Sequence, residues 1–112
     1  MSNSCFTFAL GKSLPGTHLV YLYGELDAST SVGLSDALCS VGHSTVIADR
    51  SGLGFIDASG ISQLVRARQF LRSTGNDLVV RGANRTTRRV FGILKLSDML
   101  EESENPKLKP AA

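Results

Sequence analysis

The side chains best suited to chemistry in this sequence lie in one short step, Asp57-Ala58-Ser59-Gly60. The step follows a predicted buried strand and a glycine-bearing turn that contains Gly52, and it opens a segment with apolar residues at helical spacing. The start of a helix has unpaired backbone N–H groups and a partial positive charge, so it accommodates an anion well. The pattern therefore predicts one of three roles for the Ser59 hydroxyl: a helix cap, a ligand contact or a site of reversible phosphorylation. Asp57 is also a candidate helix cap.

No other set of residues in the sequence has the spacing of a catalytic or metal site. His18 and His43 are far apart, and Cys5 and Cys39 form neither a metal-ligand motif nor a redox pair. We therefore expect no enzyme activity, no catalytic residues, no metal and no cofactor. The two cysteines are expected to be reduced and to serve in packing.

Length and composition favour one folded domain. The chain has 112 residues, of which 42% are hydrophobic and 20% are charged. We expect a domain over residues 4–100 and a flexible polar tail over residues 101–112. No apolar run approaches the length of about 20 residues that spans a membrane, and the first residues lack the layout of a signal peptide. These features predict a cytoplasmic protein without a membrane span.

Positive charge is concentrated in the second half of the domain. Residues 58–96 contain eight basic side chains and one acidic side chain, although the whole chain has a formal net charge of only +2. Such a block could steer an acidic partner, but solvated helix faces give the same count. Arg85, Arg88 and Arg89 are not interleaved with aromatic residues that could stack on bases. We therefore expect no direct binding of nucleic acid.

Periodicity and turn residues divide the domain into alternating strands and helices. The segment 18–23 is nearly continuous in apolar character, which predicts a strand buried on both faces. Arg68 falls within the apolar stripe of a predicted helix, so its stem lies along the core edge or that helix is only partly covered. The expected strands are residues 4–10, 18–23, 45–48 and 78–80, with a turn at 11–16 and a last short strand or turn at 96–100. The expected helices are one of about three turns capped by Asp27, Ser29 or Thr30 and closed by Gly42, one over 58–73, and one capped by Asn84 with Val90, Phe91 and Leu94 inward.

This alternation predicts an α/β or α+β fold. Strands separated by helices pair in parallel through right-handed crossovers. We expect a mixed sheet of four or five strands with three or so helices packed mainly on one face.

Three linked motifs carry a family resemblance. They are Gly24-Glu25-Leu26-Asp27, then Asp49-x-Ser51-Gly52-Leu53-x-Phe55-Ile56-Asp57-Ala58-Ser59-Gly60, then Arg85-x-x-Arg88-Arg89-Val90-Phe91. Over residues 5–100 the sequence resembles a STAS domain. More narrowly, it is similar to the bacterial anti-anti-sigma factors, which are also called anti-sigma factor antagonists.

The resemblance implies a switch between partners. Members of this family bind a serine-kinase anti-sigma factor and so release a sigma factor. The kinase uses ATP and magnesium to phosphorylate a serine that corresponds to Ser59, and a metal-dependent phosphatase of the PP2C type restores the binding form. The resemblance places Asp27, Asp57, Ala58, Ser59 and Gly60 in the partner-binding site.

An alternative is left open by the sequence. A STAS domain can also act as a constitutive interaction module or a small-ligand module, for example in a signalling scaffold, as the cytosolic subunit of a lipid transporter, or by binding a nucleotide at the helix start. The chain also departs from the family pattern at three positions. Arg50 stands where the family usually has leucine, Gly92 replaces a polar helix residue, and Lys95 stands where a helix-ending glycine is common.

Overall fold

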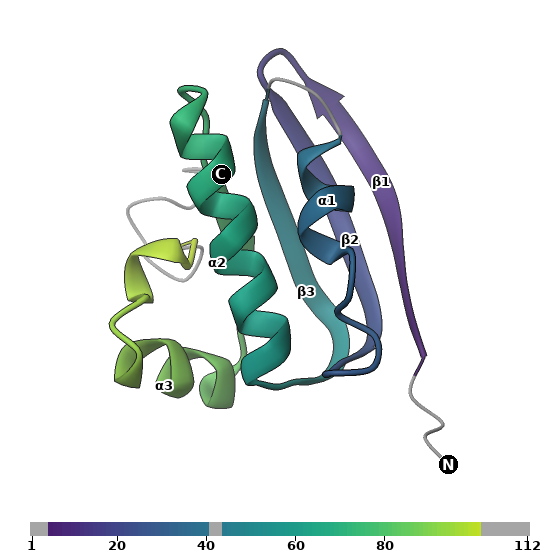
Figure 1. Cartoon of the computed structure of the whole chain (residues 1–112), viewed down its shortest axis with the longest axis vertical. Helices are drawn as coiled ribbons and strands as arrows, with labels where there is room; N and C mark the ends of the chain where they lie inside the picture. Colours follow the sequence, from purple (N-terminus) through teal and green to yellow (C-terminus); the bar gives the residue numbers. More distant parts are fainter. Residues whose placement is uncertain (1–4, 41–43, 102–112) are drawn as a thin grey trace, which may run out of the picture.

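The protein folds as a mixed four-stranded sheet with helices on one face (Figure 1). The computed structural model describes residues 5–40 and 44–101. The strand order is β1-β2-β3-β4, with β1 antiparallel to β2 and with β2, β3 and β4 mutually parallel. The elements in chain order are β1 (Phe6–Leu14), β2 (Thr17–Leu26), α1 (Leu34–Cys39), β3 (Thr45–Ile56), α2 (Ala58–Ser73), β4 (Leu78–Arg81), α3 (Arg85–Ile93) and the 3-10 helix η1 (Ser97–Met99). The predicted class and sheet type are confirmed.

The core lies between the sheet and the helices. Alternate residues of β2 point into it, so Val20 and Leu22 are fully buried. The residues between them face the opposite side of the sheet, where Leu19 and Tyr21 are half-buried and Tyr23 is 44% exposed. The prediction that this strand is buried on both faces was therefore wrong. Since α1 and α2 both lie over the same face, the other face lacks a helical cover among the described residues (Figure 1).

The strands are longer than the sequence predicted, because glycines that indicated turns lie within strands. β1 continues to Leu14, so the turn predicted at 11–16 is reduced to Pro15 and Gly16, where Gly16 has φ 77°. β3 continues through the stretch expected as a loop and pairs with the end of β2, with two register shifts. An added Cβ at Gly52 would lie 2.5 Å from a ring carbon of Tyr23, so glycine permits this close pairing. Ser4, which was included in the first predicted strand, lies outside the described residues.

Helix α1 is shorter than expected and begins later. It covers Leu34–Cys39, and its N-cap is Gly33, with φ 84° and no side-chain hydrogen bond. The predicted caps Asp27, Ser29 and Thr30 fix a separate turn that precedes the helix. Gly42, the predicted end of this helix, lies outside the described residues.

Helices α2 and α3 begin where the sequence predicted. Asn84 caps α3, because its side chain accepts a hydrogen bond from Thr87 N at 2.8 Å. Phe91 is fully buried and Val90 packs against the core, as expected. The prediction for Leu94 was wrong, since this residue is 48% exposed. The helix turns Thr87 inward instead, one turn before Phe91.

Arg68 of α2 is buried and ion-paired. Its guanidinium lies 2.7 Å from Asp98 Oδ2 and 3.3 Å from Asp77 Oδ1, and Arg72 also binds Asp77. These pairs explain how an arginine fits within the apolar stripe. They also tie α2 to η1, which forms part of the segment expected as a strand or turn. That segment ends with Leu100 in a parallel bridge to Val80.

The cysteines have different environments. Cys39 is half-buried against the core, and burial raises the pKa of its thiol. Cys5 is exposed, so the expected packing role was wrong for this residue. Both thiols are free. Within the described part of the chain, no helix has both the length and the apolar character needed to cross a membrane.

Asp49 and Arg81 form an ion pair between β3 and β4, opposite each other in the register. Arg81 Nη2 lies 2.8 Å from Asp49 Oδ2, and Ser51 donates to Asp49 Oδ1 from its backbone N and its hydroxyl. Burial alone would raise the pKa of Asp49, but the hydrogen bonds from Ser51 and Arg81 outweigh it and lower that pKa. The ionised form of Asp49 therefore stabilises the fold.

Helix α3 ends in a strained turn at Lys95. Leu96 N donates to Phe91 O at 2.7 Å, and Lys95 N donates to Gly92 O at 3.1 Å, which is the pattern that usually requires glycine. Lys95 has φ 59°, in the left-handed region. The corresponding residue of α2 is Gly75, with φ 85°. The left-handed conformation costs a residue other than glycine about 1–2 kcal/mol.

We expect Lys95→Gly to raise the free energy of unfolding by about 0.5–1 kcal/mol, because relief of strain exceeds the added entropy of the unfolded chain. Urea denaturation at neutral pH measures this change. Lys95→Ala is the matched control, since it removes the same charge but keeps the strained backbone. Equal stabilisation by both variants would contradict the explanation.

We expect Asp49→Asn to lower the free energy of unfolding by about 1–3 kcal/mol at pH 7, because Arg81 loses its anionic partner. The native pKa of Asp49 is lowered, so its contribution is present above the unfolded-state pKa of about 4 and is lost as the pH falls through the native pKa. The difference between wild type and variant should therefore shrink in acid. Urea denaturation over a pH series tests this, with Glu25→Gln, at an exposed residue, as the control.

Candidate functional site

The step from β3 to α2 is fixed by the carboxylate of Asp57. Its Oδ1 accepts hydrogen bonds from Ser59 N at 2.9 Å and from Gly60 N at 3.1 Å, so Asp57 is the N-cap of α2. A cap of this kind contributes on the order of 1 kcal/mol to stability. The Ser59 hydroxyl makes no hydrogen bond with another described residue. Of the three roles that the sequence allowed, capping thus belongs to Asp57, and the hydroxyl of Ser59 is left for a ligand or for modification.

Gly60 allows the first turn of α2 to lie against the end of β2. The residue is buried, and an added Cβ would lie 2.8 Å from Leu26 Cγ and 2.9 Å from Leu26 O. The same carbonyl of Leu26 accepts a hydrogen bond from Asp57 N at 3.1 Å. Two contacts with one residue therefore set the distance between the start of α2 and the end of β2.

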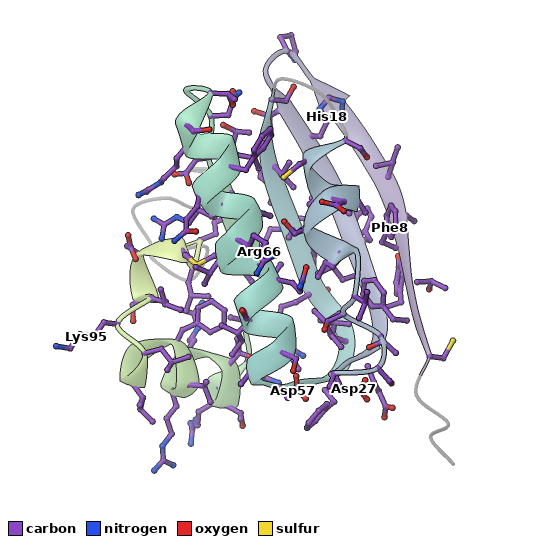
Figure 2. All side chains as sticks on the ribbon, viewed as in Figure 1. Phe8, His18, Asp27, Asp57, Arg66 and Lys95 are labelled. Carbon is purple, nitrogen blue, oxygen red and sulfur yellow. The ribbon has the colours of Figure 1, made fainter. Side chains whose placement is uncertain are left out.

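Asp27 directly follows β2 and organises a tight turn. Its Oδ1 accepts hydrogen bonds from Ser29 N at 2.9 Å, from Ser29 Oγ at 2.8 Å and from Thr30 N at 3.1 Å. Thr30 Oγ1 in turn donates to Glu25 O at 2.7 Å. Because Asp27 follows Leu26, the turn lies at the same end of the molecule as the start of α2, and Figure 2 shows Asp27 and Asp57 together at this end.

Ser59 lines a shallow hollow between this turn and α2, which we call the Ser59 hollow. Ser59 is half-buried, while Ala58 and Ser62 are exposed and Val32 is 81% exposed. The structure thus brings Asp27, Asp57, Ala58 and Ser59 to one accessible end of the molecule, with Gly60 buried beneath them. The lining residues are Ala28, Ser31, Val32, Ala58, Ser59, Ser62 and Gln63.

A second hollow, which we call the α1–α2 groove, lies farther along α2. Gln63 Oε1 lies at the boundary of the two hollows and accepts a hydrogen bond from Ser35 N of α1 at 3.1 Å. The sequence analysis missed this groove, although Arg66 and Phe70 recur at helical spacing after Ser59 and are both exposed. The groove is lined by Ser35, Asp36, Cys39, Ser40, Arg66 and Phe70.

Local carboxylates pair with three of the eight basic side chains of residues 58–96. Arg68 and Arg72 pair with Asp77, and Arg81 pairs with Asp49. In α3, Arg85 and Arg89 are exposed, as expected for a solvated helix face. Within residues 5–40 and 44–101, no group of three or more His, Cys, Asp or Glu side chains is placed to hold a metal ion. The Ser59 hollow itself has no basic residue in its lining.

Comparisons with known proteins agree with this architecture. A family model described as Mlab, STAS domain, matches residues 12–101. The structure is similar to that of the anti-sigma factor antagonist SpoIIAA in its unphosphorylated form, with 23% identity, a TM-score of 0.72 and coverage of 88% of this chain and 91% of that chain. No curated protein sequence gives a significant match.

Two further structures have the same fold. The Bacillus cell fate determinant SpoIIAA in the phosphorylated form is 23% identical with a TM-score of 0.66, and covers 88% of this chain and 95% of its own. An anti-sigma factor antagonist from Mycobacterium paratuberculosis is 24% identical with a TM-score of 0.69, and covers 88% of this chain and 86% of its own. Because the family model matches most of the chain and the fold agrees, this protein belongs to the STAS domain family.

Proposed function

We propose that this protein is an anti-sigma factor antagonist. It binds a serine-kinase anti-sigma factor and so releases a sigma factor for transcription, and phosphorylation of Ser59 by the bound kinase switches the interaction off. A phosphatase of the PP2C type restores the binding form. The observation that carries the proposal is the position of Ser59, whose hydroxyl lies at the accessible start of α2 while Asp57 does the capping.

The structural neighbours support this proposal in a general way. Two of them are named as anti-sigma factor antagonists, and SpoIIAA has been seen in an unphosphorylated and a phosphorylated form. The sequence identities are below 25%, so these structures speak for the fold, and the argument for the switch depends on the chemistry of this chain.

Electrostatics explains why one phosphate would be an effective switch. A phosphoserine carries about −1.5 to −2 charges at neutral pH. The start of a helix accommodates that charge, so the domain itself remains folded. A partner surface that packs over the Ser59 hollow would instead bury a dianion close to Asp27 and Asp57. Repulsion and desolvation would then oppose binding.

The surrounding residues have distinct parts in the proposed interface. Asp27, Asp57 and Ala58 flank Ser59 and offer the kinase its first contacts. Gly60 has an indirect role. Because it has no side chain, α2 can begin close to Leu26, which keeps Ser59 beside the Asp27 turn. The α1–α2 groove extends the surface along α2, and the exposed ring of Phe70 provides an apolar contact of the kind that interfaces favour.

We expect the full chain to gain one phosphate, at Ser59, when it is incubated with its serine-kinase anti-sigma factor, ATP and magnesium. Intact mass and peptide mapping locate the phosphate. Ser59→Ala should gain none, whereas Ser62→Ala, which changes a neighbouring serine of the same hollow, should gain it as the wild type does.

Binding to the same kinase gives an independent readout. Ser59→Asp should weaken binding by at least about tenfold, since like charges in an interface cost several kcal/mol. Ser59→Ala should bind as tightly as the wild type. Equal binding of both variants would rule out the switch. A folded protein that binds a partner of another class and is phosphorylated by no candidate kinase would favour a constitutive interaction module.

We expect Ser59→Asp to change the free energy of unfolding by no more than about 0.5 kcal/mol, because an acidic residue in the first turn of a helix is tolerated. Urea denaturation of the variant beside Ser59→Ala measures this. A large loss of stability would mean that weakened binding reflects unfolding and not the added charge.

A further inference from the structure

A third cavity, distinct from the Ser59 hollow and the α1–α2 groove, lies on the other side of the start of α2. It has a volume of about 200 Å³, is partly open to solvent, and is bounded by the second half of β3, the first turn of α2 and α3. Most of its wall is apolar, with Phe55, Ile61 and Phe91 among its residues. The polar part of the wall comes from Arg50, Asn84 and Thr87.

Arg50 is a buried cation that pairs with no carboxylate of residues 5–40 and 44–101. The residue is only 4% exposed, and its guanidinium donates hydrogen bonds to Thr87 Oγ1, Asn84 Oδ1 and Leu53 O, which are all neutral acceptors. Its Nε is buried and has no hydrogen-bond acceptor in the described part of the chain. Among the described residues, no carboxylate forms a salt bridge with Arg50, in contrast to Arg68 and Arg81. Since a buried charge is costly unless it is paired, an anion bound beside this side chain would lower that cost.

The start of α3 adds to the positive potential in the cavity. Asn84 caps this helix and Thr87 lies in its first turn, so the helix points its N-terminal end toward Arg50. The first turn of α3 contains no acidic side chain. Arg50 and the helix start therefore favour an anion at the same place.

The size and the walls of the cavity restrict the anion that fits. A cavity of about 150 Å³ accommodates benzene, so one of about 200 Å³ has room for a small ring or a short branched chain that carries one charged group. A single buried guanidinium matches a single negative charge. We propose that the cavity binds a small organic monocarboxylate, with its carboxylate against Arg50 and its apolar body against the aromatic and branched side chains of the wall.

Titration of the full chain with benzoate, followed by 1H–15N NMR, tests this proposal. We expect saturable binding with a dissociation constant on the order of 1 mM or lower, with shifts centred on Gly54, Thr86 and Phe91. Benzamide has nearly the same shape but no charge, and acetate has the charge but no apolar body. Each should bind at least about tenfold more weakly than benzoate.

Two variants separate the cavity from nonspecific attraction of anions. Arg50→Leu should weaken benzoate binding at least about tenfold, since it removes the countercharge. Arg85→Ala removes an exposed positive charge from the start of the same helix without altering the cavity, and should bind benzoate within about twofold of the wild type.

Several outcomes would overturn the proposal. These are absence of saturable binding, equal affinity for benzoate and benzamide, equal affinity for benzoate and acetate, and equal loss of binding in Arg50→Leu and Arg85→Ala. Even if Arg50→Leu fails to fold, the affinities of the wild-type protein for benzoate, benzamide and acetate test the proposal. The test does not involve Ser59, so its result is independent of the proposed switch.

Discussion

The contact between Gly60 and Leu26 determines the geometry of the candidate site. Because α2 begins directly against the last residue of β2, the residue that follows β2 and the residues that begin α2 meet at one end of the sheet. The parallel pairing of β2 with β3 makes this meeting possible, since both strands run toward the same edge. An ordinary side chain at position 60 would push α2 away from β2 and separate Ser59 from the Asp27 turn.

Several arginines form ion pairs with nearby carboxylates, and each group of pairs connects two neighbouring elements of the fold. Asp77 and Asp98 hold Arg68 where α2 meets η1, and Asp49 holds Arg81 where β3 meets β4. Together with the pair of Arg72 and Asp77, these sets bind three of the eight basic side chains of residues 58–96 to carboxylates. Arg50 is the exception among the buried arginines of the described residues, because its partners are all neutral. The contrast is informative because the same chain pairs its other buried arginine with carboxylates.

The sequence was sufficient for the fold class, for α2 and α3 with their caps, and for the residues of the step before α2. The prediction from sequence failed at glycines, because a glycine can either end a strand in a turn or lie within a strand that approaches its neighbour closely. Gly52 indicated a turn but permits a strand to approach Tyr23 closely, and this difference depends on a neighbouring strand that local patterns do not reveal. It also missed the environment of Arg50, since burial of a long polar side chain depends on how β3 and α3 pack. The only indication in the sequence was that Arg50 stands where the family usually has leucine.

The Ser59 hollow is built from two segments that are distant in the chain, the turn after β2 and the first turns of α2. Neither segment makes the surface by itself, and they meet only when β2 and β3 have paired in register. A short peptide that contains the serine would therefore lack half of the surface, as would a nascent chain that has not yet completed the sheet. A partner that contacted both segments would therefore bind the folded protein and not the unfolded chain.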